Sequence, residues 1–432
     1  LLLLACNVYI MVYFQNPEEK GVSWLRRILV ILALEFLEIS VFMIPADVLN
    51  VGPPEGKIPI EIIWYVVYYV MIAFAVIVMP FGLCWYSYDE DTKFPKKLGL
   101  SILFGIVFLV VFLVFAVVLY LLFGVAEVPV TYQNANLMEN FDLEKLKSAE
   151  VRPSDDDKTY TIKFRLAPVL FLIAGMSTVG YVLVLVFGGL GMGALPVSLI
   201  YDFINRPLPI KQQDYKKITK CVGQRALEMI DEGKEIKTLT GRKYRKRYQK
   251  FREEVYIIDK GLKALNNRHA LKGFLWGYVA LVLGIICAII SLLWVVQLVV
   301  WTILKIFPLI DWCMGWMTGK LSFFGSIFYA IFAVYLLACV FKGVTYVGFR
   351  FALGFLFYPM EVGNTYMSAF CFNTILLILG AFGVNQFCTE TFSNFTEGTT
   401  IQLFMGDSIT QMRYIKYIYK YAPFVIPVLC IL

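Results

Sequence analysis

Long apolar stretches separated by shorter polar connections dominate the chain. A membrane helix needs about 20 consecutive apolar residues, because the hydrocarbon core of a bilayer is about 30 Å thick. The pattern therefore predicts an all-α polytopic membrane protein with about nine transmembrane helices, of which the first and last are cut short. We expect them at residues 1–14, 28–48, 60–86, 98–124, 166–188, 273–304, 321–341, 365–388 and from 422 onward.

The polar connections divide the chain into regions with different expected roles. The uncharged run 273–304 is longer than a bilayer core requires, so its helix must tilt or protrude. The predicted regions are spans one to four at 1–124, a lumenal or extracellular acidic loop at 125–165, span five with a short interfacial helix at 166–205, a basic cytosolic helical hairpin at 206–272, spans six to eight at 273–388, a second lumenal or extracellular loop at 389–421, and the start of span nine at 422–432.

Composition supports lipid as the solvent of this chain. Hydrophobic residues make up 59% of it and charged residues only 16%, whereas about a quarter of the residues of a soluble domain are charged. The nine cysteines are scattered, without a C-x-x-C pair, so most of them are interpreted as small membrane-buried hydrophobes. The composition excludes an ordinary soluble globular protein.

Basic residues predict the orientation in the membrane. The connections 15–27, 86–97, 206–272 and 342–364 carry 27 Lys and Arg residues, whereas the other four carry 12. The positive-inside rule places the first set in the cytosol, so we expect a lumenal or extracellular N-terminus and a cytosolic C-terminus. The sequon Asn394-Phe395-Thr396 lies in a predicted lumenal loop, which makes Asn394 a glycosylation candidate.

The segment 206–272 holds 19 of the Lys and Arg residues and shows helical periodicity on both sides of a break near Gly233–Gly241. It predicts a two-helix hairpin with an apolar stripe. One interpretation is a docking surface for a protein partner or for anionic lipid headgroups. The other is that the stripe only packs the two helices together. Nucleic-acid binding is disfavoured, because the segment has no base-reading architecture.

No motif in the sequence supports catalysis, a cofactor or a metal. His269 is the single histidine, which rules out multi-histidine metal sites and makes Ser-His or Cys-His catalysis improbable. The segments Gly52–Lys57 and Gly315–Lys320 resemble phosphate loops, and Gly189–Ala194 resembles a dinucleotide-binding loop, but the required strand precedes none of them. We therefore predict a protein that is not an enzyme.

Three carboxylates lie within or beside an apolar helix. Glu35 and Glu38 are three residues apart in the second predicted span, and so share one face, while Asp47 follows Pro45 near its lumenal end. Ionisable groups at membrane depth are costly and usually face the protein interior or water. Glu35 and Glu38 either carry a proton or a cationic solute, or bond structurally to a neighbouring helix, while Asp47 is better placed to cap a helix.

A second unusual stretch follows span five, where glycines are clustered between Gly188 and Gly193 and precede Pro196. Such glycines end a helix or let two backbones approach closely, and Pro196 is expected to begin a short amphipathic helix. Its residues Gly191, Met192, Ala194, Leu195 and Pro196 form a candidate hinge or motif. Together with Pro45-Ala46-Asp47-Val48, the run Gly191-Met192-Gly193-Ala194-Leu195-Pro196 resembles the limb-region (LMBR) type membrane proteins, which include the lipocalin-interacting membrane receptors.

The resemblance extends over almost the whole chain, and the acidic turn Tyr86–Asp91 is similar to the branch of the lysosomal cobalamin-transport escort protein. It implies a dimeric, non-catalytic receptor or escort in an endomembrane or the plasma membrane. Such a protein would handle a small hydrophobic or vitamin-like ligand, with an ABC-type transporter or a lipocalin-like carrier as partner. The alternative is a secondary transporter that uses Glu35 and Glu38.

Overall fold

The computed structural model contains two compact units. The first unit comprises Leu1–Ala194 and Ile290–Leu432, and the second comprises Leu195–Ile289. The boundary between them falls inside the glycine-rich motif. The structure describes the chain apart from residues 1, 16–23, 52–57, 88–93, 133–157, 207, 209, 238–240, 270, 322, 348–359, 361, 364, 411, 413–414 and 432.

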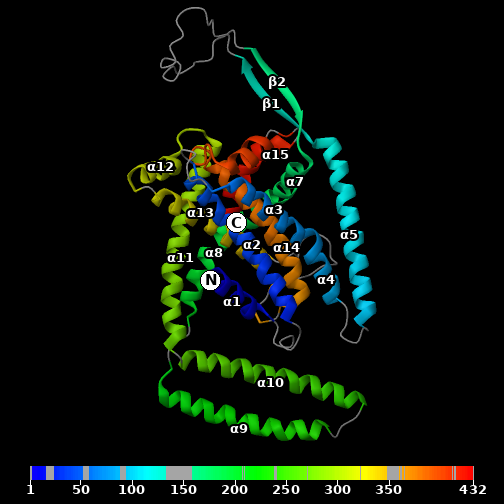
Figure 1. Ribbon diagram of the computed structural model, residues 1–432. Helices are drawn as coiled ribbons and strands as arrows, with labels where there is room; N and C mark the ends of the chain where they lie inside the picture. The colour runs from blue at the N-terminus through cyan, green and yellow to red at the C-terminus, as the bar shows by residue number, and fades with distance from the viewer. Residues whose placement is uncertain are drawn as a thin grey trace, which may run out of the picture. The chain divides into compact units, whose positions relative to one another are not determined.

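The described residues include seven helices that are long and apolar enough to cross a membrane. They confirm an all-α polytopic membrane protein, with the segments 1–14 and 422 onward forming the shorter helices α1 (Leu2–Phe14) and α16 (Val425–Ile431) (Figure 1). Nine spans therefore remain a prediction. The seven helices are α2 (Trp24–Leu49), α3 to α4 (Ile60–Ser87), α5 (Phe94–Phe123), α7 to α8 (Pro168–Ile204), α11 (Leu271–Gln297) continued by η4 (Leu298–Ile303), α13 (Phe324–Val347) and α14 (Met367–Thr391).

Helix α14 forms the centre of the first unit. Of its most apolar window, 78% is buried inside the protein, and it packs against α2, α4, α7 and α13. Aromatic rings fill the space around it: Phe382 stacks on Tyr68, and Phe387 stacks on Trp294. A helix that is apolar on all sides is expected at such a position, because every face meets protein or lipid.

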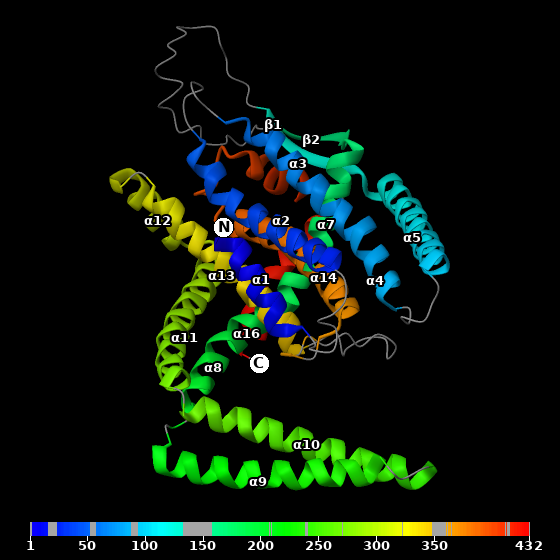
Figure 2. The same ribbon diagram turned by 60° about the horizontal axis from the view of Figure 1, so that its bottom comes forward.

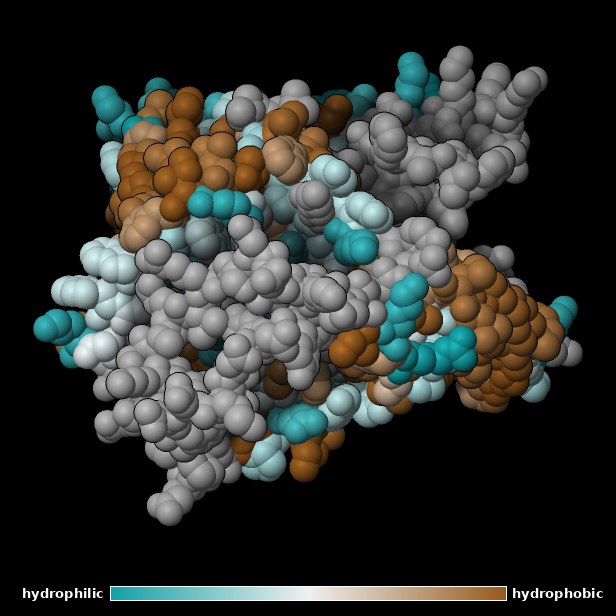
Figure 3. All heavy atoms as spheres, turned by 90° about the horizontal axis from the view of Figure 1, so that it is seen from above, coloured by the Kyte–Doolittle hydropathy of each residue, from teal (hydrophilic) through white to brown (hydrophobic). Residues whose placement is uncertain are grey.

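Helix α5 has the opposite surroundings. None of its most apolar window is buried, and it contacts the unit mainly through α4. In Figure 3 it lies at the right edge as a continuous apolar surface. Apolar side chains on every face of a helix beside the bundle are expected where the solvent is lipid rather than water.

The segment 125–165 was predicted as a loop, but a β-strand forms at each of its two ends. Strand β1 (Val125–Tyr132) pairs with β2 (Lys158–Arg165) in an antiparallel ribbon, with Ala126 opposite Phe164 and Glu127 opposite Lys163. The acidic residues Asp155, Asp156 and Asp157 lie outside the described residues. The ribbon forms because both segments alternate β-branched or aromatic residues with polar ones, a period of two that suits a strand.

Two further connections that were predicted as loops contain helices. Residues 305–320 include α12 (Leu309–Leu321), whose exposed Trp312 and Trp316 suit a membrane interface. Residues 389–421 include the π-helix η5 (Gln402–Ile409) and α15 (Ile415–Tyr421), and Ile401, Met405 and Ile409 are fully buried there. The second connection is thus part of the core rather than a free lumenal loop.

Asp311 in α12 provides a pH-dependent test of this packing. The side chain is 4% exposed, and burial raises the pKa of its carboxyl from 3.8 to about 7. The unfolded chain then loses this proton at a lower pH than the folded chain does. The folded state should therefore lose up to about 4 kcal/mol as the pH rises from about 4 to 7.

We expect Asp311→Asn to have a smaller slope than the wild type, because it removes the contribution of Asp311, and to be more stable than the wild type above neutral pH. Thermal unfolding of the purified protein in detergent, at acidic and at alkaline pH, measures the effect. The exposed Asp214 supplies a control, because Asp214→Asn should keep the wild-type slope. Equal slopes in wild type and Asp311→Asn would contradict the burial argument.

The second unit contains the predicted hairpin, which is confirmed as two helices. Helix α9 (Gln212–Lys237) and helix α10 (Gly241–His269) lie side by side in both ribbon views (Figures 1 and 2). Met229, Ile236 and Leu265 are buried between them. The end of α8 packs on α11 in the same unit, where the Arg206 guanidinium lies 4.1 Å from the Phe203 ring and 5.4 Å from the Tyr278 ring.

Candidate functional site

Asp47 joins three separate parts of the first unit. It lies two residues after Pro45 in the last turns of α2 and is 1% exposed. Trp64 Nε1 on α3 donates to Asp47 Oδ2 over 3.0 Å, and the backbone N–H groups of Ile401 and Thr400 donate to the two carboxylate oxygens over 2.7 and 3.3 Å. Asp47 therefore accepts hydrogen bonds from the backbone N–H groups of the turn that opens η5, as a carboxylate does at a helix start.

The contact continues from Asp47 into the centre of the bundle. Trp64 stacks on Tyr68 with 5.1 Å between the ring centroids, and Tyr68 stacks on Phe382 of α14 at 4.9 Å. Asn385 Nδ2, also on α14, donates to the Tyr68 hydroxyl. These side chains are buried, so the Asp47 contact belongs to a continuous core rather than to an open binding pocket.

The glycine-rich motif is part of an uninterrupted helix, so of the two alternatives for its glycines, that they end span five or that they let backbones approach closely, the first is wrong. The helix runs from Pro168 to Ile204 through the π-turn η3 (Val184–Gly188), and Pro196 lies inside α8 (Gly189–Ile204) rather than at its start. A π-turn leaves carbonyl groups without their usual partners and often marks a functional position. Proline is tolerated because neighbouring groups satisfy the freed backbone.

The glycines instead bring backbones together. A Cβ on Gly191 would overlap the backbone carbonyl of Cys339 on α13, and one on Gly180 would overlap that of Leu379 on α14. Next to Gly191, Met192 is fully buried, and its carbonyl oxygen accepts a hydrogen bond from Ser291. Small residues at helix crossings permit this close packing in membranes.

The remaining motif residues stand where the two units divide. Ala194 is the last residue of one stretch of the first unit, and Leu195 begins the second unit. Pro196 is buried one residue later. Pro45 is also buried within α2. A hinge at Ala194–Pro196 therefore stays a prediction, now located at the division between two compact units.

Glu35 and Glu38 share a partner that the sequence did not single out. Asn7 Nδ2 on α1 donates to Glu35 Oε1 over 3.2 Å and to Glu38 Oε2 over 3.0 Å. Asn7 is completely buried, whereas both glutamates are partly buried. The sequence could have pointed to Asn7, since it is the only amide or charged side chain between Leu1 and Phe14.

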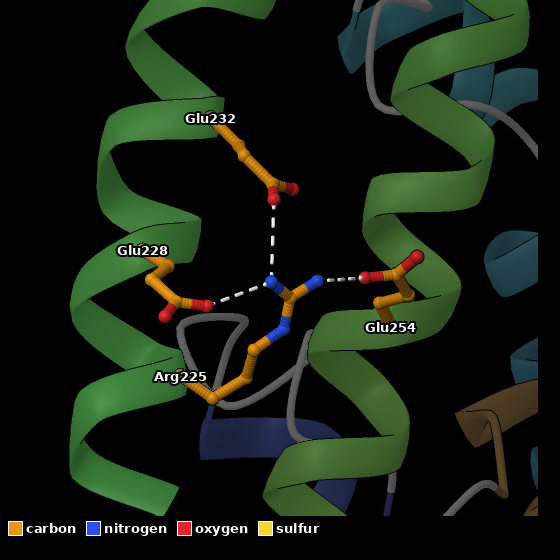
Figure 4. A network of polar contacts seen from close by, with 4 residues as sticks. All are labelled: Arg225, Glu228, Glu232 and Glu254. Atoms are coloured by element: carbon orange, nitrogen blue, oxygen red, sulfur yellow. Dashed lines mark hydrogen bonds and ion pairs between the residues drawn. The ribbon is translucent and has the colours of Figure 1, made fainter.

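The hairpin carries a network of exposed ion pairs. Arg225 on α9 donates to Glu228 over 2.9 Å and to Glu232 over 3.4 Å, and it reaches across to Glu254 on α10 over 3.0 Å (Figure 4). These hydrogen bonds raise the pKa of Arg225. Because all four side chains are exposed, the network sets the register of the two helices more than it stabilises them.

A surface groove of about 580 Å³ opens beside this seam. It is apolar except for Lys234, and its other lining residues are Met229, Ile230, Gly233, Ile236, Tyr248 and Phe251. The hairpin segment 206–272 contains 19 basic and 8 acidic residues, although the whole chain has a net charge of only +7. An apolar groove within a positive surface suits an amphipathic segment with acidic flanks.

Asn394 lies in the turn after α14 and is exposed, whereas Thr396 of the same sequon is buried. Glycosylation of Asn394 stays a prediction, and a glycosidase-sensitive mobility shift that Asn394→Gln abolishes would test it. The acidic turn Tyr86–Asp91 falls mostly outside the described residues. Among the residues that the structure describes, no group of three or more His, Cys, Asp or Glu side chains could hold a metal ion.

The chain has clear relatives. The family model of the LMBR1-like membrane proteins matches residues 1–261. A LIMR family protein of Dictyostelium discoideum is 29% identical, over 98% of this chain and 92% of that protein, and one of Oryza sativa subsp. japonica is 27% identical, over 98% and 90%. A probable lysosomal cobalamin transporter of Dictyostelium discoideum is 22% identical over 46% of this chain and 38% of its own length. No solved structure matches the chain.

Proposed function

Because the chain belongs to the LMBR1-like family of membrane proteins, we propose that it is a non-enzymatic receptor or transport-accessory (escort) protein. It would handle a small hydrophobic or vitamin-like ligand by binding the carrier or the transporter of that ligand. The observation that carries this proposal is the hairpin α9–α10, which combines a strong positive charge with an apolar groove beside Ile230 and Tyr248.

The partner that fits this surface is a membrane transporter, such as an ABC-type protein, with an amphipathic acidic segment on its cytosolic face. The apolar side of such a segment would fill the groove, and its carboxylates would meet Lys234 and the surrounding cations. Cobalamin and the lysosomal membrane are the first ligand and location to test, since one relative is named a probable lysosomal cobalamin transporter.

The ribbon β1–β2 is the proposed contact for a lipocalin-like carrier on the opposite side of the membrane. Ile162 and Phe164 of β2 are 53% and 44% exposed, and they alternate with the charged Lys163 and Arg165. The open edge of a two-stranded ribbon can pair with a strand of a partner, and its exposed apolar side chains can contact apolar side chains of that partner. Together with the hairpin it would give the protein one partner surface on each side.

Crosslinking mass spectrometry on the protein purified from its native membranes tests the hairpin proposal. We expect crosslinks from a copurified transporter to α9 and α10, and their loss in the double variant Ile230→Glu/Tyr248→Glu. Leu227→Glu is the matched control, because Leu227 is exposed on α9 and does not line the groove, and it should keep the partner. A transporter that crosslinks only elsewhere, or that the double variant retains, would contradict the proposal.

A secondary transporter is the second candidate, favoured by the shared contact of Asn7 with Glu35 and Glu38. Buried carboxylates in a membrane helix are common at ion and substrate pathways. In this case Glu35→Gln would abolish substrate flux in vesicles that contain the purified protein alone. Substrate flux that is unchanged in this variant, or absent from the wild type, would contradict the transporter and favour the accessory role.

A further inference from the structure

The carboxylates of Glu35 and Glu38 lie deep in the membrane segment that contains them. The apolar part of α2 extends from Arg27 to Leu49, so that Glu38 stands at its midpoint and Glu35 one turn nearer to Arg27. Three residues of α-helix advance about 4.5 Å. Both side chains therefore lie at a depth where a charge is expensive unless a partner offsets it.

A single amide contacts both carboxylates. Asn7 Nδ2 has two N–H groups, and it donates one hydrogen bond to Glu35 and one to Glu38 over 3.2 and 3.0 Å. Two ionised carboxylates that share one neutral donor repel each other strongly in a medium of low dielectric constant. Among the described residues, no Lys or Arg forms an ion pair with either of them, so this repulsion is not offset by a basic group.

Among the described residues, the oxygen of the Asn7 amide has no hydrogen-bond donor. Asn7 is 0% exposed, and its Oδ1 accepts no hydrogen bond. An acceptor that is buried without a donor costs about 1–3 kcal/mol. The group that would satisfy Oδ1 must bring a hydrogen to the same small space that the two carboxylates occupy.

A protonated carboxyl is that group. A carboxylic acid and a carboxamide pair through two hydrogen bonds, in which the amide N–H donates to one acid oxygen and the acid O–H donates to the amide oxygen. We propose that Asn7, Glu35 and Glu38 form an intramembrane proton-binding site. One proton, taken from water, is held by the carboxylate pair and donated to Asn7 Oδ1, and the remaining carboxylate keeps the single negative charge.

Among the described residues, the polar and charged groups of the neighbouring helices do not supply an alternative donor. Helix α2 packs against α1, α3, α13 and α14. On α1, Cys6 and Tyr9 are exposed, and on α3, Glu61 is exposed. On α13, Lys342 forms no ion pair with either glutamate, and on α14, Asn373 donates to the Ala369 carbonyl. Asp47 of α2 itself is bound to Trp64 and Ile401.

Infrared difference spectroscopy of the purified full chain in lipid nanodiscs tests the site directly. We expect the Asp311→Asn protein, in which the band of the Asp311 carboxyl is absent, to show a protonated carboxyl band at neutral pH. That band should shift on exchange into D₂O and be lost above the pH at which the pair releases its proton. In the same Asp311→Asn background, Glu35→Gln/Glu38→Gln should lose the part of the band that the pair contributes, and Asn7→Leu should weaken it and move its titration. Glu61→Gln on the exposed face of α3 should keep the band unchanged.

Two results would overturn the proposal. One is a band of equal intensity in the Asp311→Asn protein and in its double glutamine variant, with both proteins monodisperse. The other is a protein without a protonated carboxyl band at neutral pH. If Na⁺ instead changes the carboxylate bands of that protein, the pair binds a metal cation in place of the proton. If the double variant does not fold, Glu35→Gln alone and the D₂O shift of the Asp311→Asn protein decide. The result does not depend on hairpin docking.

Discussion

Asp47→Ala should unfold the first unit or destabilise it severely. The replacement leaves the buried Trp64 indole N–H and Ile401 backbone N–H without an acceptor, and it also removes the acceptor of the part-buried Thr400 backbone N–H. Each buried donor without a partner costs about 1–3 kcal/mol, so the two buried donors alone predict a loss of about 2–6 kcal/mol. Thermal unfolding followed by size-exclusion chromatography in detergent should show a large fall in Tm or a loss of monodisperse protein.

A double-mutant cycle with Trp64→Phe separates this contact from general disruption. Phenylalanine can keep the stack on Tyr68 but removes the indole donor. In the Trp64→Phe background, Asp47→Ala should therefore cost about 1–3 kcal/mol less than in the wild type. Asp202→Asn, at an exposed position, should change little. Additive effects of the two substitutions would contradict a direct bond between Asp47 and Trp64.

The helices were predictable because their signal is local. Apolar runs of membrane length identify themselves in any window of the sequence, and the hairpin α9–α10 repeats its apolar residues at helical spacing on both sides of residues 238–240. The family resemblance, which rested on Pro45-Ala46-Asp47 and on Gly191–Pro196, is confirmed by the match of the family model to residues 1–261.

The partners of the candidate residues were not predictable, because they come from distant parts of the chain. Asp47 and Ile401 are 354 residues apart, and Asn7 and Glu38 are 31 residues apart on different helices. No periodicity within one segment specifies such a pair. The strands β1 and β2 were missed for a related reason, since each is short and the acidic stretch between them dominated the composition of the loop.

Two sets of polar groups in the first unit differ in whether their hydrogen-bonding atoms all have partners. Asp47 has donors for both carboxylate oxygens, so its charge is used in holding α2, α3 and the start of η5 together. The cluster on α1 and α2 has an unused acceptor, because Asn7 Oδ1 has no donor. A satisfied buried group is typical of architecture, whereas an unsatisfied one invites a ligand. We therefore expect Asp47 to have a structural role and the pair Glu35 and Glu38 to bind a proton, although one helix carries all three carboxylates.

The close contact at Gly191 predicts the second large effect. In Gly191→Ala the new Cβ would overlap the Cys339 carbonyl, and because the obstacle is backbone, α8 and α13 would have to move apart. Overpacking of a tight core costs about 1–3 kcal/mol and sometimes more, and separation would also weaken the neighbouring bond from Ser291 to the Met192 carbonyl. We expect a loss of about 3 kcal/mol or more, seen as a lower Tm in detergent.

Gly175 is the matched control for this substitution. It lies on the same continuous helix, but a Cβ there would meet no heavy atom within 4 Å. Gly175→Ala should therefore be neutral or stabilise the protein by up to about 1 kcal/mol, since alanine favours a helix over glycine. Equal effects at the two positions would mean that helix propensity rather than contact decides. A loss confined to Gly191 would show that this glycine of the motif is required for backbone packing, which leaves Ala194–Pro196 as the place for a hinge.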